Sequence, residues 1–233
     1  MALRPIFYDT ETTGISTRND FIIELAAYDP EQDRTFEALI KPSISIPPSA
    51  TAIHHITDEM VANKPSFKKV AEDFIQFCEG EVVLIAHNNN QFDEPMMQSE
   101  FARHDLEFPD WKFLDSLKWA RRYRPDLPRH SLQVLRETYG FPENNAHRAL
   151  DDVVTLQRVF EAMVGDLSMD TIYQLLEVGQ FIQIMPFGKY KGKPLQVVPS
   201  SYIEWLTSNG ALDKKDNKDL KNSFEKLGLL TAS

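Results

Sequence analysis

Hydrophobic and polar positions follow two different periods along the chain, and these periods predict its secondary structure. Short runs rich in β-branched and aromatic residues, each closed by polar or turn-forming residues, predict strands. Strands are predicted at residues 3–8, 21–28, 34–40, 81–87 and 112–114. The polar turn at residues 29–32 predicts a hairpin, so the chain opens with an antiparallel meander.

Apolar residues at intervals of three and four predict helices between and after the later strands. Helices are predicted after Pro65 and at residues 93–101, 131–139 and 149–164. Between the third strand and the first of these helices, Pro42, Pro47 and Pro48 predict an extended loop. The predicted fold class is α/β, with a mixed five-stranded sheet flanked by helices.

The hydrophobic pattern changes after Gly165, which divides the chain into three predicted parts. Residues 1–165 form the α/β domain, residues 166–180 a connecting helix, and residues 181–233 a small α+β accessory module. The module contains a basic turn punctuated by glycines, at residues 187–194, followed by apolar residues at helical spacing.

Composition places the chain among ordinary globular proteins, with 42% apolar and 26% charged residues. No apolar run is long enough to cross a bilayer, so no membrane partner is predicted. The single cysteine, Cys78, cannot form an intrachain disulfide and lies at an apolar helix position. A reducing, cytoplasmic location is therefore predicted.

The net charge of −10 argues against a protein that coats nucleic acid through bulk attraction, but not against an enzyme that grips one strand end. Basic residues gather in two places. They are Arg121, Arg122, Arg124 and Arg129, and then Lys189, Lys191 and Lys193. Each cluster is equally well explained as a solvated face.

Acidic residues recur where predicted elements begin or end: Asp9 and Glu11 after the first strand, Asp93 after the fourth, and Asp152 inside the last helix of the domain. Residues two apart in a strand point the same way, so Asp9 and Glu11 would converge. The alternative is that both are turn residues, and that Asp93 only caps a helix.

His147 precedes the helix that carries Asp152. Five residues turn a helix by about 140°, so His147 would reach toward Asp152 from the preceding loop rather than from the same helix face. Four carboxylates with one histidine suit two hard cations, such as Mg²⁺ or Mn²⁺, better than zinc.

The motifs that contain these residues resemble those of the DEDDh 3'→5' exonucleases, the DnaQ-like family with a ribonuclease H-like fold. They are Asp9-Thr10-Glu11-Thr12-Thr13-Gly14, Ala86-His87-Asn88 with Phe92-Asp93, and His147 followed by Asp152. The resemblance covers about residues 1–165. The spacing between Asn88 and Phe92, with the following Pro95, resembles three-prime repair exonucleases (TREX) rather than proofreading subunits. Residues 52–57 and 187–194 resemble bacterial exodeoxyribonuclease X.

This resemblance implies a role for each motif residue. Asp9, Glu11, Asp93 and Asp152 would hold two Mg²⁺ ions, or Mn²⁺, and His147 would take the proton of the attacking water. Substrate contacts are implied at Glu11, Thr12, Gly14, Ile15, His54 and Asn88. Ile15 would wedge between the last bases, or else fold onto the core; His54 and Asn88 are otherwise structural loop residues.

The implied function is a metal-dependent 3'→5' exodeoxyribonuclease that releases 5'-mononucleotides from single-stranded or duplex DNA ends, in DNA repair or end processing. Two alternatives remain, an RNA-trimming exonuclease of the same fold and a proofreading or binding subunit of a polymerase or repair complex. A homodimer is an alternative to a monomer. The lysines of the basic turn would grip DNA, or else form a solvated hairpin face.

Overall fold

The computed structural model describes residues 3–143, 149–177, 181–214 and 217–230. The chain divides into two compact units, Met1–Ile172 and Tyr173–Ser233, and each has its own hydrophobic core. Among the helices in these described ranges, none is both long and apolar enough to cross a membrane.

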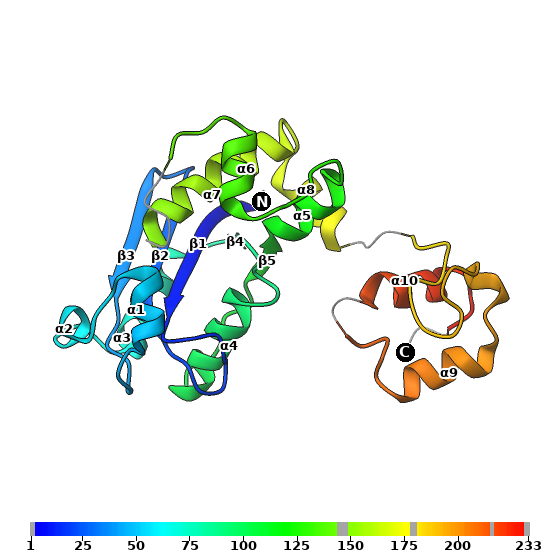
Figure 1. The fold of residues 1–233 in the computed structure, drawn as a ribbon, viewed down its shortest axis with the longest axis horizontal. Coiled ribbons are helices and arrows are strands. Elements are labelled where there is room, and N and C mark those ends of the chain that lie inside the picture. The colour runs from blue at the N-terminus through cyan, green and yellow to red at the C-terminus, as the bar shows by residue number, and fades with distance from the viewer. Residues whose placement is uncertain (1–2, 144–148, 178–180, 215–216, 231–233) are drawn as a thin grey trace. The chain divides into compact units, whose positions relative to one another are not determined.

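A five-stranded sheet forms the centre of the first unit (Figure 1). Its strands are β1 (Arg4–Thr12), β2 (Ile22–Asp29), β3 (Arg34–Leu39), β4 (Val82–Ala86) and β5 (Lys112–Asp115). They lie in the order β3-β2-β1-β4-β5, which places β1 in the middle. Strands β1, β2 and β3 form an antiparallel meander, whereas β4 and β5 run parallel to β1. The predicted mixed five-stranded sheet is confirmed.

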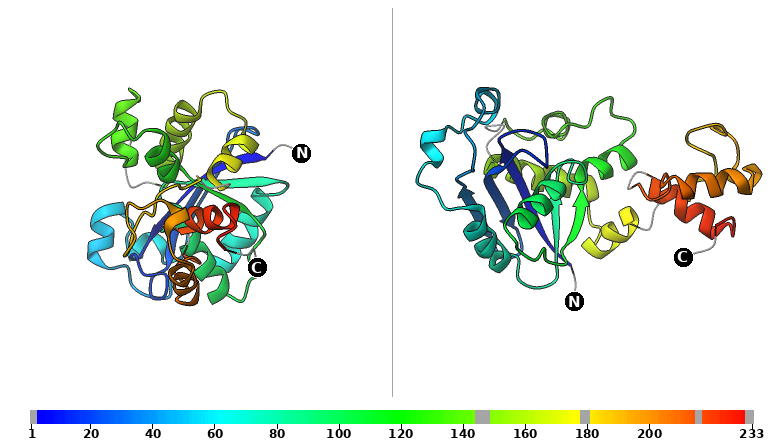
Figure 2. Two further views of the ribbon diagram at one scale, coloured as in Figure 1. Left: turned by 90° about the vertical axis from the view of Figure 1, so that its right-hand side faces the viewer. Right: turned by 90° about the horizontal axis from the view of Figure 1, so that it is seen from below.

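Helices cover both faces of this sheet, as Figures 1 and 2 show. They are α1 (Pro48–His54), α2 (Asp58–Val61), α3 (Phe67–Phe77), α4 (Asp93–Arg103), α5 (Ser116–Tyr123), α6 (Leu132–Thr138) and α7 (Ala149–Val164). Phe7 of β1 packs against Phe160 of α7, with 5.8 Å between ring centroids. Tyr8, the next residue, lies in the core shared with α3 and α4. Because side chains alternate along a strand, Asp9 and Glu11 share the Phe7 face, toward α7.

Two predictions for the N-terminal half are wrong in their bounds. Strand β1 continues to Thr12 instead of ending at Tyr8, because Glu11 pairs with Glu24 of β2 and extends the ladder. The acids therefore stand inside a strand and not in a turn. The loop predicted after Pro42 contains α1, since Pro48 stands at the start of a helix, where the missing N–H of proline leaves no hydrogen bond unmade.

The second unit is mainly helical. Helix α8 (Met169–Glu177) spans the boundary between the units, and the second unit then contains the 3-10 turn η1 (Leu195–Val197), α9 (Ser200–Ser208) and α10 (Lys218–Lys226). Ile203 of α9 and Phe224 of α10 are buried in one core, together with Leu195 of η1 and Met185 from the segment that precedes η1. Figure 2 shows both helices in orange and red. The β component in its described part is a single bridge between Ile184 and Pro194.

Candidate active site

Three of the predicted carboxylates meet where β1 faces the start of α7. Asp9 and Glu11 come from β1, and Asp152 comes from the first turn of α7. One carboxylate oxygen from each lies within 4.8 Å of the others, and all three side chains are partly buried. This spacing suits one or more shared cations, and it arises because α7 packs across β1 and β2.

The electrostatics of this cluster favour a positive ligand. Burial raises the pKa of Asp9 well above its usual value, and the negative charges of Asp93, Glu11 and Asp152 raise it further. Like-charged carboxylates at such distances cannot all ionise cheaply without a counter-charge. A divalent cation would supply that charge, so the residues present fit a metal centre.

Asp93, the fourth predicted carboxylate, reaches the same region from the first residue of α4. Its Oδ1 accepts a hydrogen bond from the Thr10 hydroxyl at 2.8 Å. Burial raises the pKa of Asp93 to about 7, so its protonated form is populated near neutral pH. Asp93 is close enough to raise the pKa of Asp9, yet it is bonded to a β1 residue that points away from Asp9. The structure thus places it beside the cluster of three, not within it.

His147, the predicted proton acceptor, lies outside the described residues. Asp152, five residues after His147, is among the described residues. The side-chain amide of Gln133 in α6 donates a hydrogen bond to the Asp152 Oδ1 at 3.4 Å. Helix α6 therefore contributes to the position of this carboxylate.

Glu24 is an acidic residue of this region that the sequence analysis missed. It is fully buried in β2, directly across the ladder from Glu11. Its Oε2 accepts a hydrogen bond at 3.2 Å from the backbone N–H of Ala149, the first residue of α7. A carboxylate at a helix N-terminus is favourable, so Glu24 fixes the end of α7 that carries Asp152. Its one signal in the sequence is a lone acid inside the apolar run of residues 22–28.

Asp115 at the end of β5 organises the loop that contains Asn88. Its carboxylate accepts backbone hydrogen bonds from Asn88 and Asn90 at 3.1 Å each, and it also caps α5. Asn88 adopts a left-handed conformation, with φ of 69°, which asparagine tolerates better than most residues. The alternative reading of Asn88 as a structural loop residue is thereby supported, without testing its predicted contact with substrate.

A basic cavity of about 530 Å³ opens beside this loop. Its lining residues are His87, Asn88, Leu117, Arg121, Pro128, Arg129, His130 and Ser131. Burial lowers the pKa of His87, whose Nδ1 lies 2.8 Å from the Ser116 hydroxyl, so its ring is neutral at physiological pH. The two arginines supply the positive charge. Part of the arginine cluster noticed in the sequence therefore lines a cavity next to a predicted substrate-binding residue.

The loop after β1 presents Ile15 to solvent, with 87% of its side chain exposed. Gly14 allows the tight path of this loop, because a Cβ there would lie 2.6 Å from the Asp20 carboxylate. That carboxylate accepts hydrogen bonds from the Thr13 hydroxyl and the Ser16 backbone. Ile15 is therefore not folded onto the core, and its predicted contact with bases is sterically open.

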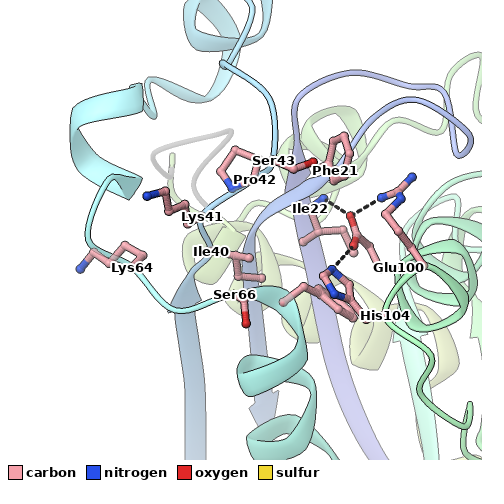
Figure 3. Close-up of a pocket in the computed structure, with 12 residues that line it drawn as sticks. Phe21, Ile22, Ile40, Lys41, Pro42, Ser43, Lys64, Ser66, Glu100 and His104 are labelled. Carbon is pink, nitrogen blue, oxygen red and sulfur yellow. Dashed lines mark hydrogen bonds and ion pairs between the residues drawn. The ribbon is translucent and has the colours of Figure 1, made fainter.

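Helix α4 ties the same loop to the sheet (Figure 3). The buried Glu100 carboxylate accepts from the Ile22 backbone N–H at 3.1 Å and pairs with Arg103 at 2.7 Å. The Arg103 guanidinium lies 4.1 Å over the Phe21 ring and donates to backbone carbonyls of residues 17, 18 and 20. A cavity of about 440 Å³ adjoins these contacts. These contacts anchor to α4 the part of the loop that directly follows the exposed Ile15.

His54 differs from the other predicted substrate residues in its burial. It is the last residue of α1, only 2% exposed, and its Nδ1 accepts a hydrogen bond from the Ile56 backbone N–H at 3.0 Å. This bond orders the turn after α1, and the contact of His54 with a 3' end stays a prediction.

Metal ions should stabilise the protein more at alkaline than at acidic pH. Because burial raises the pKa of Asp93 from 3.8 to about 7, its protonation stabilises the metal-free fold below pH 4, and this contribution is lost as the pH rises through 7. Cations bind the deprotonated carboxylates. At about 100 times the Kd, Mn²⁺ should add about 2.7 kcal/mol at pH near 8, or roughly 5–10 °C in Tm.

Calorimetry with Mn²⁺ or EDTA near pH 8 and pH 5 measures this difference. Asp9→Asn should abolish the response, while Asp151→Asn, a change outside the cluster of three, should preserve it. Equal metal shifts at both pH values would contradict the prediction.

Comparison with known proteins gives matches for both units. Residues 6–160 match the family model described as "Exonuclease", and residues 174–216 match a family described as "Putative quorum-sensing-regulated virulence factor". DNA polymerase III subunit epsilon of Treponema pallidum is 37% identical over 163 residues, which cover 68% of this chain and 75% of that relative. Exonuclease DPD1 of Arabidopsis thaliana is 35% identical over 72% of this chain, which spans only 58% of that protein.

Among solved structures, exonuclease X in complex with 5' overhanging duplex DNA is 26% identical, with a TM-score of 0.55 over 74% of this chain and 99% of that one. The nuclease domain of 3'hExo, a DEDDh family member bound to rAMP, is 17% identical, with a TM-score of 0.60 over 71% of this chain and 93% of that one. These likenesses confirm the predicted ribonuclease H-like fold of the first unit.

Proposed function

The chain belongs to the DEDDh, DnaQ-like exonuclease family, and from this premise we propose that it is a metal-dependent 3'→5' exodeoxyribonuclease that removes 5'-mononucleotides from DNA ends in repair or end processing. The observation that carries the proposal is the convergence of Asp9, Glu11 and Asp152 within 4.8 Å. Without this convergence, the same fold would lack a place where carboxylates could bind the catalytic metal ions.

Mg²⁺ is the proposed metal, with Mn²⁺ as a substitute, because the cluster offers only carboxylate oxygens. Asp9, Glu11 and Asp152 would hold the ions, and Asp93 in its deprotonated form would complete the set through the carboxylate oxygen that Thr10 does not bond. Bound divalent ions supply charge neutralisation at the scissile phosphate and lower the pKa of a water molecule.

The residues of the chain itself would orient the substrate and move the proton. His147 is proposed as the group that accepts the proton of the attacking water, a role that its near-neutral reference pKa suits. Glu24 keeps the start of α7 against β2, so that Asp152 faces Asp9 across a fixed gap. The backbone near Thr12, together with Asn88, would contact the terminal nucleotide.

DNA binding is supported by the basic cavity beside Asn88 and by the exposed Ile15. Arg121 and Arg129 would contact phosphates, which positions a strand without reading its sequence. Ile15 would separate the last bases as an apolar wedge, a contact that does not depend on hydrogen bonds to particular bases. The structure of exonuclease X in complex with duplex DNA, at 26% identity to this chain, supports DNA as the proposed substrate.

Ile15→Ala should lower kcat/KM on DNA about tenfold, the loss expected when an aliphatic side chain of this size no longer buries its surface against the bases. The Tm should not change, because the side chain is 87% exposed and supports no core packing. Steady-state kinetics on a 3'-terminal fluorescent oligonucleotide measure the effect. Ile44→Ala, at an apolar residue also exposed, is the matched control and should behave as wild type. An unchanged kcat/KM for Ile15→Ala would remove the wedge assignment.

A degradation panel tests the proposed function directly. It compares single-stranded and duplex DNA and RNA, each with free or blocked 3' ends, in Mg²⁺, Mn²⁺ or EDTA. Release of 5'-mononucleotides from free DNA 3' ends in Mg²⁺ is expected, with none in EDTA. Activity that survives EDTA would refute the mechanism, and activity confined to RNA would refute the substrate.

A second candidate is a proofreading subunit, favoured by the 37% identity to a DNA polymerase III subunit epsilon. It predicts co-purification with a polymerase and an increase of exonuclease activity on mismatched ends in that complex. The three residues between Asn88 and Phe92 make this assignment the less favoured of the two.

A further inference from the structure

The second unit presents a row of aromatic side chains on one face. Tyr190 comes from the basic turn, and Tyr202 and Trp205 come from α9. The rings of Tyr190 and Tyr202 meet edge to face at 4.9 Å, and those of Tyr202 and Trp205 stack at 5.6 Å with an interplanar angle of 14°. Tyr190 and Tyr202 line the margin of the core, whereas Trp205 lies outside it.

Trp205 is exposed in a helix that otherwise has a well-packed inner side. It is 54% exposed, while its neighbours Ile203 and Leu206 are 2% and 1% exposed. The Trp205 ring is therefore accessible, and an accessible indole face can stack on a planar group of a ligand. One face of the Trp205 ring stacks on Tyr202. A planar ligand on the other face would extend this stack.

The basic turn is fixed against this row by its glycine. Gly188 has φ of +73°, and a Cβ there would lie 2.3 Å from the Tyr202 hydroxyl oxygen. The Lys189 backbone N–H donates to that same oxygen at 3.3 Å. The Lys189 ammonium lies 5.6 Å from the centroid of the Tyr190 ring. The turn therefore has a defined position beside the aromatic row.

Positive charge is concentrated at this turn in a chain whose net charge is −10. Lys189, Lys191 and Lys193 are all exposed. The single acid of α9, Glu204, is two positions from Tyr202 and so points about 200° away from it around the helix. Aromatic faces next to mobile cations match a ligand with planar groups and a phosphate chain.

We propose that the Tyr190–Tyr202–Trp205 row and the lysines of the basic turn form a binding site for single-stranded DNA, separate from the acidic cluster. An unpaired base stacks on Trp205, and the adjoining phosphates contact the lysines. Duplex DNA fits less well, because its bases already stack on one another and offer no free face. The choice of DNA rests on the proposed function; the stacking argument does not.

Fluorescence anisotropy with the full-length protein in EDTA tests this site without hydrolysis. The probe is a 5'-labelled oligothymidine with a 3'-phosphate, compared with a blunt duplex of equal length. Trp205→Ala should weaken binding to the single strand about tenfold, and Trp205→Phe should keep most of it. In the double variant Lys189→Ala/Lys191→Ala, the binding constant should depend less steeply on salt. The slope of log K against log salt concentration should become shallower by about 0.7 for each phosphate contact that is lost.

Val197→Ala and Lys226→Ala are the matched controls, because both residues are exposed in the same unit and lie outside the row. Both should bind as wild type, and circular dichroism should show all variants folded. Wild-type affinity in Trp205→Ala, as expected if the face bound a protein partner instead, would overturn the proposal. An equal loss on duplex and single strand would overturn it too.

The proposed function and this site can fail separately. If the protein hydrolyses no DNA, yet loses single-strand affinity in Trp205→Ala, the site stands and the exonuclease proposal falls.

Discussion

Asp152→Asn should lower the rate of 3'-end hydrolysis about a thousandfold, since charge stabilisation by metal ions contributes several kcal/mol to such reactions. The substitution keeps the size of the side chain but removes one of the three negative charges that lie within 4.8 Å. The measurement is single-turnover release of mononucleotides in Mg²⁺. Loss of charge should weaken metal binding as well, so the activity should recover in part at high Mn²⁺.

Asp151→Asn is the natural control for this experiment. Asp151 is the preceding residue of α7 and is also partly buried, but it lines a different cavity with Phe141 and Arg158. Its substitution should leave hydrolysis within about twofold of wild type. In EDTA, Asp152→Asn should be as stable as wild type or more so, because the Asp152 charge raises the pKa of Asp9. If Asp152→Asn kept a tenth or more of the wild-type rate of hydrolysis, the assignment of Asp152 as a metal ligand would be contradicted.

His147→Ala should lower hydrolysis about 10²- to 10⁴-fold, the range expected for loss of a general base. Wild-type kcat should rise with pH through about 6.5 as the imidazole loses its proton, and then level off. The residual activity of the variant should lack this rise, which a purely structural role would not remove. Rate profiles between about pH 5 and pH 9 measure both effects.

His55→Asn serves as the control for a histidine with no assigned role. His55 is exposed and adopts φ of 63°, a conformation that asparagine accepts without strain. It should retain both the rate and the pH profile of wild type. Unchanged turnover in His147→Ala would exclude this residue as the base.

The sheet and most helices could be predicted because their signals are local. The run at residues 81–87 is too short for a helix and apolar enough for a central strand. The spacing of Val70, Phe74 and Phe77 matches the period of a helix. The end of β1 could not be predicted locally. Asp9 and Glu11 have weak strand propensity, and they are strand residues only because β2 supplies the partner for each.

The candidate site shows the same division between local and long-range information. The spacing of Asp9 and Glu11 places both on one face of a strand, which the sequence alone indicates. That Asp152 joins them, while Asp93 bonds instead to Thr10, depends on how α7 and α4 dock. Glu24 was missed because its partner, the Ala149 backbone, is 125 residues away. Burial of His54 follows from α1, an element that the prolines concealed.

The central position of β1 also restricts how the sequence of its first residues can diverge. Phe7 is paired on one side with Tyr28 and on the other with Ile85, so the strand cannot slide against either neighbour. A one-residue insertion or deletion between Arg4 and Tyr8 would turn Asp9 and Glu11 toward α3 and α4. Homologous chains should therefore vary in this segment by substitution alone, with gaps in their alignment confined to the loops on either side.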